Sequence, residues 1–412
     1  MIGEFLKEIN KVIPLIKNSV IVEQIEEMKK SETVLLKCLE YYQGITLGLV
    51  MIVKNQEDLI SDVLKATKDF NLDNYVVVDT GSSDKTVENL LKLNFVRTEY
   101  LHWEENYSLM RNKAAEFSSM DWILTLDSDE VFITEPLDLK ILVSVLYTVL
   151  DKPFAINFEQ HYNGSSKYGI PDRIYSQTSE KFFGLVHEEL RTKNTEEAVM
   201  SIDTRIQVIN KGSDTKQVIK FDKEERYKNL LFQMIEIEPD NPRWVAFLSN
   251  KAIETLIINE KYEKLICKHL FITNKYSKRM GNLKIHKYTK MLLEKYISYL
   301  ILWKNYDRAN ELLKVGLLLY PNNMAFMFFK GLIQIESIKD ISRTYLKENL
   351  KNYIESDKKA LCDSSYRDTQ SLELIIAELN ELLGKKKITE KIINKITDDN
   401  LKTFWKQWNN KN

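Results

Sequence analysis

Cysteine is scarce in this sequence of 412 residues: Cys38, Cys267 and Cys362 lie far apart and form no CxxC or other metal-ligand spacing. A disulfide framework and a zinc site are therefore not indicated, and a reducing compartment fits. Long apolar runs are also missing, because the longest, such as residues 141–150, reach only about half of the length that spans a bilayer. The N-terminus mixes acids and lysines into its apolar stretch, unlike a signal peptide. We expect a cytoplasmic protein without a transmembrane segment.

An excess of charge of either sign is absent as well. The 59 lysines and arginines nearly balance the 60 aspartates and glutamates, so the formal net charge of -1 offers no electrostatic case for nucleic acid as a partner. Hydrophobic residues make up 44% and charged residues 29%, as in ordinary soluble proteins. The length allows two or three domains of roughly 100–200 residues each.

The hydrophobic pattern divides the chain into three parts. Residues 1–44 carry apolar positions at mostly helical spacings and predict a helical lead-in. Residues 45–220 alternate short β-branched runs with helical segments, which indicates a parallel sheet with crossover helices. The expected strands are 46–53, 74–80, 95–101 and 122–127, and the expected helices between them are 57–70, 84–93 and 106–118.

Residues 221–412 are predicted to be all helical, since long amphipathic stretches follow one another with little glycine or proline. Two segments repeat a turn containing Pro239 or Pro321 next to helices with small and aromatic residues, as in tetratricopeptide repeats. The spacing departs from a strict 34-residue period, so the repeats would be degenerate. An irregular helical bundle is the alternative.

The segment WILTLDSDE, residues 122–130, ends an apolar strand in three acids. Asp127 and Asp129 could bring oxygen ligands to Mg²⁺ or Mn²⁺, and such an ion could hold a diphosphate. Acids this close are costly unless a cation or solvent offsets their charge. An acidic turn is the alternative for an isolated DxD.

The segment YVVVDTGSSDKT, residues 75–86, has the same layout at the end of an earlier strand. Asp79 ends the strand, Gly81 permits a tight turn and Ser82 offers a hydroxyl, so the carboxylate could accept the N3–H of a uracil base. An ordinary strand-to-helix turn is the alternative. The GxGxxG and GxxxxGK fingerprints of other nucleotide sites are both missing.

Taken together, LVMIVKNQEDLI, VVVDTGSSDKT and LTLDSDE resemble the family 2 glycosyltransferases with the GT-A fold. The match is closest to the subgroup with a W…N-Y-S…RN segment and a later G-x-V-H-E, found here from Trp103 to Asn112 and from Gly184 to Glu188. It covers about residues 46–212. The resemblance implies a mostly parallel sheet with helices on both faces, followed by the tetratricopeptide-like helices.

The resemblance also implies roles for individual residues. Asp79 would bind the nucleobase of a UDP-sugar, and Asp127 and Asp129 the metal and diphosphate. Arg111 would counter phosphate charge, with a surface arginine as the alternative, and His187 would be a further metal ligand, with a structural histidine as the alternative. The remaining donor-binding positions are Val53, Asn55, Gly81, Ser82 and Ser128. Thr80 replaces the second acid of the commonest VDDGS version.

The subgroup usually inverts the sugar, so a base must deprotonate the acceptor on the opposite face. The candidates are Glu188, Glu189, Glu130 and Asp129, and Glu188 is favoured because a carboxylate that binds metal is a poor base. The metal would stabilise the charge that develops on the leaving phosphate.

The layout of a helical lead-in, a catalytic domain and a tetratricopeptide-like tail resembles the sublancin-type S-glycosyltransferases that modify glycocins. The implied reaction moves glucose or N-acetylglucosamine from its UDP conjugate to Cys, or also Ser, of a small ribosomally made bacteriocin precursor. The helical tail would cradle the peptide, or else form a homodimer. A cell-envelope glycan or glycolipid is the alternative acceptor. A tetratricopeptide-like scaffold with an inactive domain is a third reading, which the intact Asp79, Asp127 and Asp129 disfavour.

Overall fold

The computed structural model describes residues 2–162, 168–211, 223–258, 261–337, 342–355 and 369–410. It separates into two compact units, one holding the described residues up to Lys223 and one those from Glu224 on. The domain boundary predicted between residues 220 and 221 lies outside the described residues.

The first unit is built on a curled sheet whose described strands number nine, in the order β3-β2-β1-β4-β8-β6-β11-β5, with β7 paired to β6. Strands β3, β2, β1 and β4 are parallel, and the sheet continues into a mixed half where β4 and β6 both pair antiparallel with β8. The strands are β1 (Leu47–Val53), β2 (Asn74–Asp79), β3 (Arg97–Tyr100), β4 (Trp122–Thr125), β5 (Glu130–Phe132), β6 (Phe154–Tyr162), β7 (Tyr168–Gly169), β8 (Asp172–Ser176) and β11 (Met200–Asn210). The alternation of strands and helices in the sequence thus predicted the parallel half.

Helices lie on both faces of this sheet, because alternate residues of each strand face opposite ways. In β1, Leu49, Met51 and Val53 join one large hydrophobic cluster, whereas Val50 joins a second, smaller one. The large cluster is covered by α4 (Ile60–Lys65), α5 (Thr86–Leu91) and α7 (Leu139–Val149). The small cluster is covered by α6 (Tyr107–Glu116) and by a hairpin of β9 (Glu180–Phe183) and β10 (Glu189–Thr192). Both faces are therefore buried, as a parallel sheet requires.

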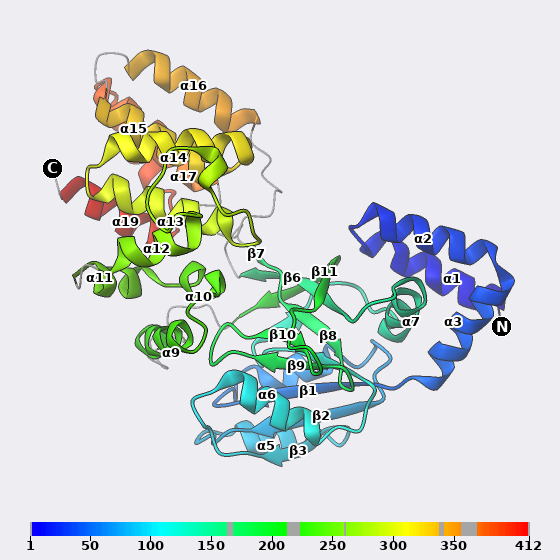
Figure 1. The fold of residues 1–412 in the computed structure, drawn as a ribbon. Helices are drawn as coiled ribbons and strands as arrows, with labels where there is room; N and C mark the ends of the chain where they lie inside the picture. Colours follow the sequence, from blue (N-terminus) through cyan, green and yellow to red (C-terminus); the bar gives the residue numbers. More distant parts are fainter. Residues whose placement is uncertain are drawn as a thin grey trace. The chain divides into compact units, whose positions relative to one another are not determined.

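The helical lead-in belongs to the same core. It consists of α1 (Ile2–Val12), η1 (Ile13–Leu15), α2 (Ser19–Lys30) and α3 (Glu32–Gly44). Its apolar side chains join the large cluster, and Figure 1 shows these helices beside α7. The rings of Tyr41 and Tyr147 stack at 3.8 Å, and Lys17 pairs with Glu159 of β6 at 2.6 Å. The lead-in is thus an integral part of the first unit's core.

The second unit is all helical in the residues described. Its helices are α9 (Lys223–Ile237), α10 (Pro242–Ala246), α11 (Asn250–Ile258), α12 (Tyr262–Leu270), η2 (Met280–Asn282), α13 (Thr289–Leu302), α14 (Tyr306–Leu319), α15 (Met324–Ser337), α16 (Ser342–Glu355), α17 (Thr369–Leu382), α18 (Lys386–Ile393) and α19 (Asp399–Asn410).

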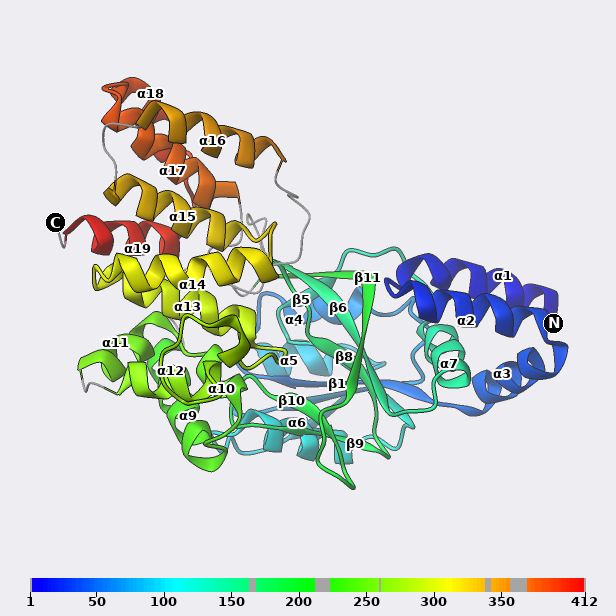
Figure 2. The same cartoon turned by 45° about the horizontal axis from the view of Figure 1, so that its top comes forward.

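Neighbouring helices of this unit pack in pairs, and Figure 2 shows α13, α14 and α15 side by side. Gly316 of α14 faces Phe326 of α15 so closely that an added Cβ would lie 3.0 Å from the ring. Asn323 caps α15 and donates to the buried Glu294 of α13 at 2.8 Å. The paired helices fit the tetratricopeptide-like interpretation. Among the described residues, no helix combines the length and the apolar character needed to cross a membrane.

The buried Glu180 of β9 makes the stability of the first unit depend on pH. Its side chain is 2% exposed, and its Oε2 accepts a hydrogen bond from Ser176 N at 2.9 Å. Burial raises the pKa of Glu180 to about 8; the Ser176 N–H opposes this rise, and nearby Asp172 adds to it. The unfolded chain therefore ionises first, and stability falls as the pH rises from about 4.5 toward 8.

We predict that Glu180→Gln, which stays neutral, removes this loss. The difference in free energy of unfolding between the variant and the parent should increase, in favour of the variant, by more than ~1 kcal/mol between pH 5 and pH 8. Urea denaturation at several pH values measures it, with the exposed Glu116→Gln as control. Parallel pH profiles of Glu180→Gln and parent would show that Glu180 is not buried as a neutral acid.

Candidate active site

The loops after β1 and β2 are joined by hydrogen bonds at the carboxyl edge of the sheet. Val53 ends β1 with its side chain in the core, and its carbonyl oxygen accepts hydrogen bonds from Thr80 N at 2.9 Å and Thr80 Oγ1 at 3.0 Å. Asn55 has a positive φ of 53° and donates from its backbone N to Ser82 Oγ at 2.9 Å. Its Oδ1 accepts from Ser83 N at 2.8 Å. These contacts fix the conformation of the loop that was predicted to bind the donor. The Thr80 hydroxyl donates its proton to a backbone carbonyl oxygen and so cannot donate it to a ligand.

Asp79 is the buried acid of this loop, and only one of its two carboxylate oxygens accepts hydrogen bonds from the described residues. Oδ1 accepts hydrogen bonds from Gly81 N at 2.9 Å and Ser82 N at 3.0 Å. Oδ2 is buried and has no hydrogen-bond partner among the described residues. Gly81 has a φ of +102°, which other residues adopt only with strain. The loop therefore turns tightly around a carboxylate that keeps one acceptor oxygen unused.

Helix α6 supplies the next group, and its sequence motif has a structural explanation. Asn106 caps the helix, since its Oδ1 accepts from Leu109 N at 3.0 Å and Ser108 Oγ at 2.9 Å. Asn112 contacts the backbone of Phe182 in β9 twice: Nδ2 donates to the carbonyl oxygen, and Oδ1 accepts from the N–H, both at 2.9 Å. Tyr107 N donates to Leu185 O at 3.0 Å. The motif thus fixes the β9–β10 hairpin against α6.

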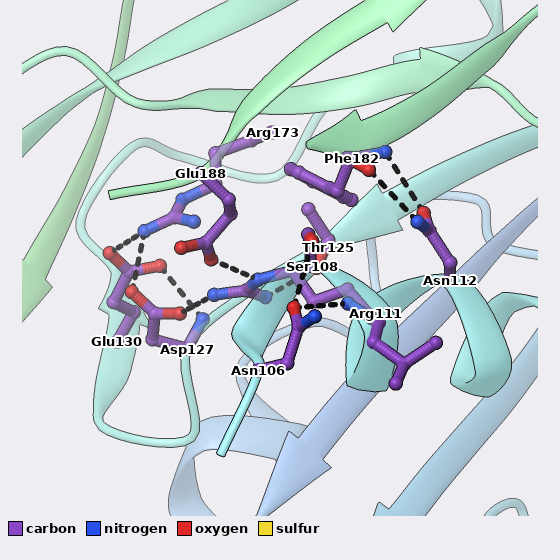
Figure 3. Close-up of polar contacts among 11 residues, drawn as sticks. Asn106, Ser108, Arg111, Asn112, Thr125, Asp127, Glu130, Arg173, Phe182 and Glu188 are labelled. Atoms are coloured by element: carbon purple, nitrogen blue, oxygen red, sulfur yellow. Dashed lines mark hydrogen bonds and ion pairs between the residues drawn. The ribbon is translucent and has the colours of Figure 1, made fainter. Parts of the chain in front are cut away.

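Arg111 lies at the centre of the site, as Figure 3 shows. Its guanidinium donates Nε to Glu188 Oε1 at 2.6 Å, Nη2 to Asp127 Oδ1 at 2.6 Å and Nη1 to Thr125 Oγ1 at 3.0 Å. Burial alone would lower the pKa of Arg111, but Glu188 and Asp127 outweigh it and raise the pKa above its usual value. Arg111 is therefore a permanently charged, buried group and not a surface arginine.

The acids after β4 have different environments. Asp127 is partly exposed, and its Oδ2 accepts from Arg173 Nη2 at 2.9 Å while Oδ1 accepts from Arg111. Burial would raise the pKa of Asp127, but these two arginines hold it well below its usual range. Asp129 is mostly buried, and its Oδ1 accepts from Asn210 Nδ2 at 2.9 Å. Ser128 lies between them in the turn and is partly exposed.

Two of the candidate bases, Glu188 and Glu189, lie at the β9–β10 hairpin. His187 and Glu188 belong to the loop between β9 and β10, where Gly184 and His187 have positive φ values of 109° and 49°. Glu189 begins β10, and its Oε1 accepts from Arg191 Nη2 at 2.8 Å. Glu188 and Asp127 lie close to each other because both pair with Arg111. The described residues contain no preformed cluster of three metal-ligating side chains.

Sequence reasoning missed Arg173 and did not foresee the burial of Glu130. Arg173 is 4% exposed in β8 and contacts both Asp127 and Glu130, and Glu130 is 0% exposed. Burial raises the pKa of Glu130 to about 7, although Arg173 opposes this. A charged residue within the strand pattern DRIYS was the only signal for Arg173. Glu130 points into a buried network, which makes it a poor candidate for the base that deprotonates an acceptor.

Comparisons with known proteins identify the family of the domain in the first unit. Residues 49–181 match the model of the glycosyl transferase family 2. The SPbeta prophage-derived glycosyltransferase SunS of Bacillus subtilis is 26% identical over 376 residues, covering 88% of this chain and 83% of SunS. A TPR repeat-containing protein of Synechococcus elongatus is 30% identical over 147 residues, covering 35% of this chain and 34% of that protein.

Among solved structures, S. aureus TarS is similar with 14% identity and a TM-score of 0.32, covering 70% of this chain and 53% of the TarS chain. A shorter TarS, residues 1–349 in complex with UDP-GlcNAc, has a TM-score of 0.34. The assignment therefore rests on the family match and on the strand order. Through residues 49–181, this chain carries a glycosyl transferase family 2 domain of the GT-A type, followed by a helical region.

Proposed function

We propose that the protein is an inverting, metal-dependent transferase that moves a sugar from UDP-glucose or UDP-N-acetylglucosamine to Cys, and also Ser, of a ribosomally made bacteriocin precursor. The observation that carries the donor site is the unused Oδ2 of Asp79 in its tight loop. The peptide acceptor follows from the resemblance of the whole layout to the glycocin S-glycosyltransferases. Similarity to a glycosyltransferase over 88% of the chain supports that layout.

Asp79 is suited to recognise uracil. Its Oδ1 is held by two backbone N–H groups, which fix the carboxylate and leave Oδ2 as a buried acceptor. A buried acceptor without a partner costs free energy, so a ligand that donates to it gains on binding. Uracil presents N3–H as a donor, whereas cytosine presents N3 as an acceptor. The same carboxylate therefore binds one pyrimidine and repels the other.

The acids after β4 fit a divalent cation only in part. Asp127, Glu130 and Glu188 pair with two guanidinium groups, those of Arg111 and Arg173, and Asp129 follows two residues after Asp127, so carboxyl groups outnumber guanidinium groups here. Mg²⁺ in such enzymes is held by one or two carboxylates together with substrate phosphates, so three preformed protein ligands are not needed. We propose Asp127, Asp129 and His187 as the residues that would hold Mg²⁺ or Mn²⁺. When bound, the ion would stabilise charge on the leaving diphosphate.

The remaining chemistry belongs to the protein's own side chains. Arg111, paired with both Asp127 and Glu188, links the donor side of the site to the side where an acceptor proton must leave. A Cys thiol, with a pKa of about 8.5, loses its proton more readily than a serine hydroxyl, so a carboxylate suffices as base. Glu188, and after it Glu189, is the proposed base; Asp129 is less suited because it is also a proposed metal ligand. The acceptor thiolate then attacks the anomeric carbon opposite the diphosphate, so the carbon–sulfur bond forms as the bond to the diphosphate oxygen breaks and UDP leaves.

Two other functions remain testable alternatives. A cell-envelope glycan or glycolipid acceptor would use the same donor site. A scaffold would bind the UDP-sugar without transfer, or not at all. The helical second unit is proposed to bind the precursor peptide, with homodimer formation as its other role. Cytoplasmic location is part of the proposal, since the acceptor and the nucleotide sugar are both made there.

Substitution of Asp79 by Asn is the sharpest test of base recognition. Asn keeps the Oδ1 acceptor for Gly81 and Ser82 but replaces the Oδ2 acceptor by an N–H donor. We predict that UDP binds Asp79→Asn at least about tenfold more weakly, while CDP binds more tightly than it binds the parent. Calorimetric titration with each nucleotide and Mn²⁺ measures both. Ser83→Ala is the matched loop control, and an unchanged preference for UDP in Asp79→Asn would contradict the assignment.

Isosteric substitutions separate the two candidate bases. We predict that Glu188→Gln lowers kcat by about 10²-fold or more and leaves UDP affinity within about twofold, because a base acts only in the chemical step. Glu189→Gln should retain most activity. Steady-state kinetics with a thiol peptide acceptor measure kcat. A large loss of kcat in Glu189→Gln with little loss in Glu188→Gln would identify Glu189 as the base. Full activity of both variants would exclude both residues as the base.

The acceptor is tested by incubating the protein with a Cys- and Ser-containing bacteriocin precursor, Mg²⁺ and each UDP-sugar. Mass spectrometry should show a hexose or N-acetylhexosamine on one residue, and the signal should vanish when EDTA removes the metal. Asp129→Asn should also lose transfer but keep the parent's thermal unfolding temperature within a few degrees. Transfer to a lipid fraction but not to the peptide would favour the alternative acceptor, and transfer in EDTA would remove the metal from the proposal.

A further inference from the structure

Arg173 is part of a closed ring of contacts around Asp127 (Figure 3). Its Nη2 donates to Asp127 Oδ2 at 2.9 Å and also to Glu130 Oε1. Glu130 in turn accepts a hydrogen bond on Oε2 from Asp127 N at 3.0 Å. The ring therefore connects the side chain of Asp127 back to its own backbone through Arg173 and Glu130.

The ring fixes how the Asp127 carboxylate is oriented. The terminal torsion of an aspartate is soft, so a carboxylate held at one oxygen can still rotate. Here Oδ1 contacts Arg111 and Oδ2 contacts Arg173, and the two arginines come from α6 and β8. Because each carboxylate oxygen contacts an arginine from a different element, rotation of the carboxylate about its terminal torsion is restricted to one orientation. Arg111 alone would not do this.

Glu130 keeps Arg173 in place. The Glu130 side chain is 0% exposed, and Gln160 Nε2 of β6 also donates to its Oε1. A buried carboxylate and a buried guanidinium are each costly unless they are paired, so removal of either leaves the other without its partner. Arg173 Nε is also buried and has no hydrogen-bond partner among the described residues, so Arg173 depends on its Nη2 contacts.

We infer that Arg173 and Glu130 are positioning residues for Asp127, and that their ring holds its carboxylate in the orientation that receives the donor diphosphate and its cation. The inference rests on the proposed donor site. It assigns no contact between Arg173 and the substrate. If this is so, substitution of Arg173 weakens UDP binding only when residue 127 is Asp. An ion pair with a purely structural role would instead change stability to the same extent whichever residue is at position 127.

A double-mutant cycle tests this consequence, with Arg173→Gln, Asp127→Asn and the double variant. The readout is the affinity of UDP in the presence of Mn²⁺, measured by calorimetry, with thermal unfolding recorded for every protein. The matched control is Lys17→Met, which removes the Lys17–Glu159 pair of 2.6 Å in the same unit and leaves the side chains of the ring unchanged.

We expect Asp127→Asn and Arg173→Gln each to weaken Mn²⁺-dependent UDP binding about tenfold or more. In the Asp127→Asn background, Arg173→Gln should add less than a twofold effect, and Arg173→Lys should recover part of the affinity in the parent background. Lys17→Met should leave UDP affinity unchanged. Additive effects, or parent-like affinity of a folded Arg173→Gln, would overturn the positioning role.

Two further outcomes keep the result decisive. If Asp127→Asn binds UDP and Mn²⁺ as tightly as the parent, the proposed donor site itself is wrong, which differs from failure of the ring alone. If Arg173→Gln does not fold, Glu130→Gln takes its place in the cycle: its amide oxygen still accepts from Arg173, but its NH2 group cannot accept from Asp127 N, so the ring is opened at that contact. Glu130→Gln should then weaken UDP binding in the parent but have little effect on it in the Asp127→Asn background. Additive effects of the two substitutions on UDP affinity would again contradict the inference.

Discussion

The site depends on one interaction, the double ion pair of Arg111 with Asp127 and Glu188. These three residues come from α6, from the loop after β4 and from the β9–β10 hairpin, and none of the three elements is adjacent to another in sequence. Without the buried guanidinium, two carboxylates would face each other across the site and repel. The interaction thus holds three separate segments together and makes a concentration of acids tolerable.

Around this centre, the parts of the site are supported in different ways. The Asp79 loop is held by backbone hydrogen bonds and the left-handed Gly81, so its carboxylate needs no cation. Asp127 is held by two arginines, and Asp129 by the amide of Asn210. The hairpin that carries Glu188 is fixed to α6 by Asn112. The Asp79 loop is therefore supported separately, whereas Asp127 and Glu188 share Arg111 as a common partner.

Much of the fold could be predicted from sequence because its signals are local. The β-branched runs gave β1, β2, β3 and β4, and the polar residues after them marked the edge where Asp79 and Asp127 lie. Asn106 and Asn112 belong to a motif seen in the sequence, but only the structure shows that Asn106 caps α6 and that Asn112 binds the backbone of the hairpin. Arg173 and Glu130 were not predictable as a pair, because they are 43 residues apart and meet only once β8 pairs between β4 and β6. Long-range pairing in a mixed sheet leaves no local pattern.

The most direct test of the account is a crystal structure of the protein with UDP and Mn²⁺. The account predicts uracil N3 within hydrogen-bond distance of Asp79 Oδ2, and the ion between the diphosphate and the acids after β4, with Arg111 still joined to Asp127. A nucleotide bound elsewhere, or bound here with its base turned away from Asp79 and no ion near Asp127 or Asp129, would contradict it.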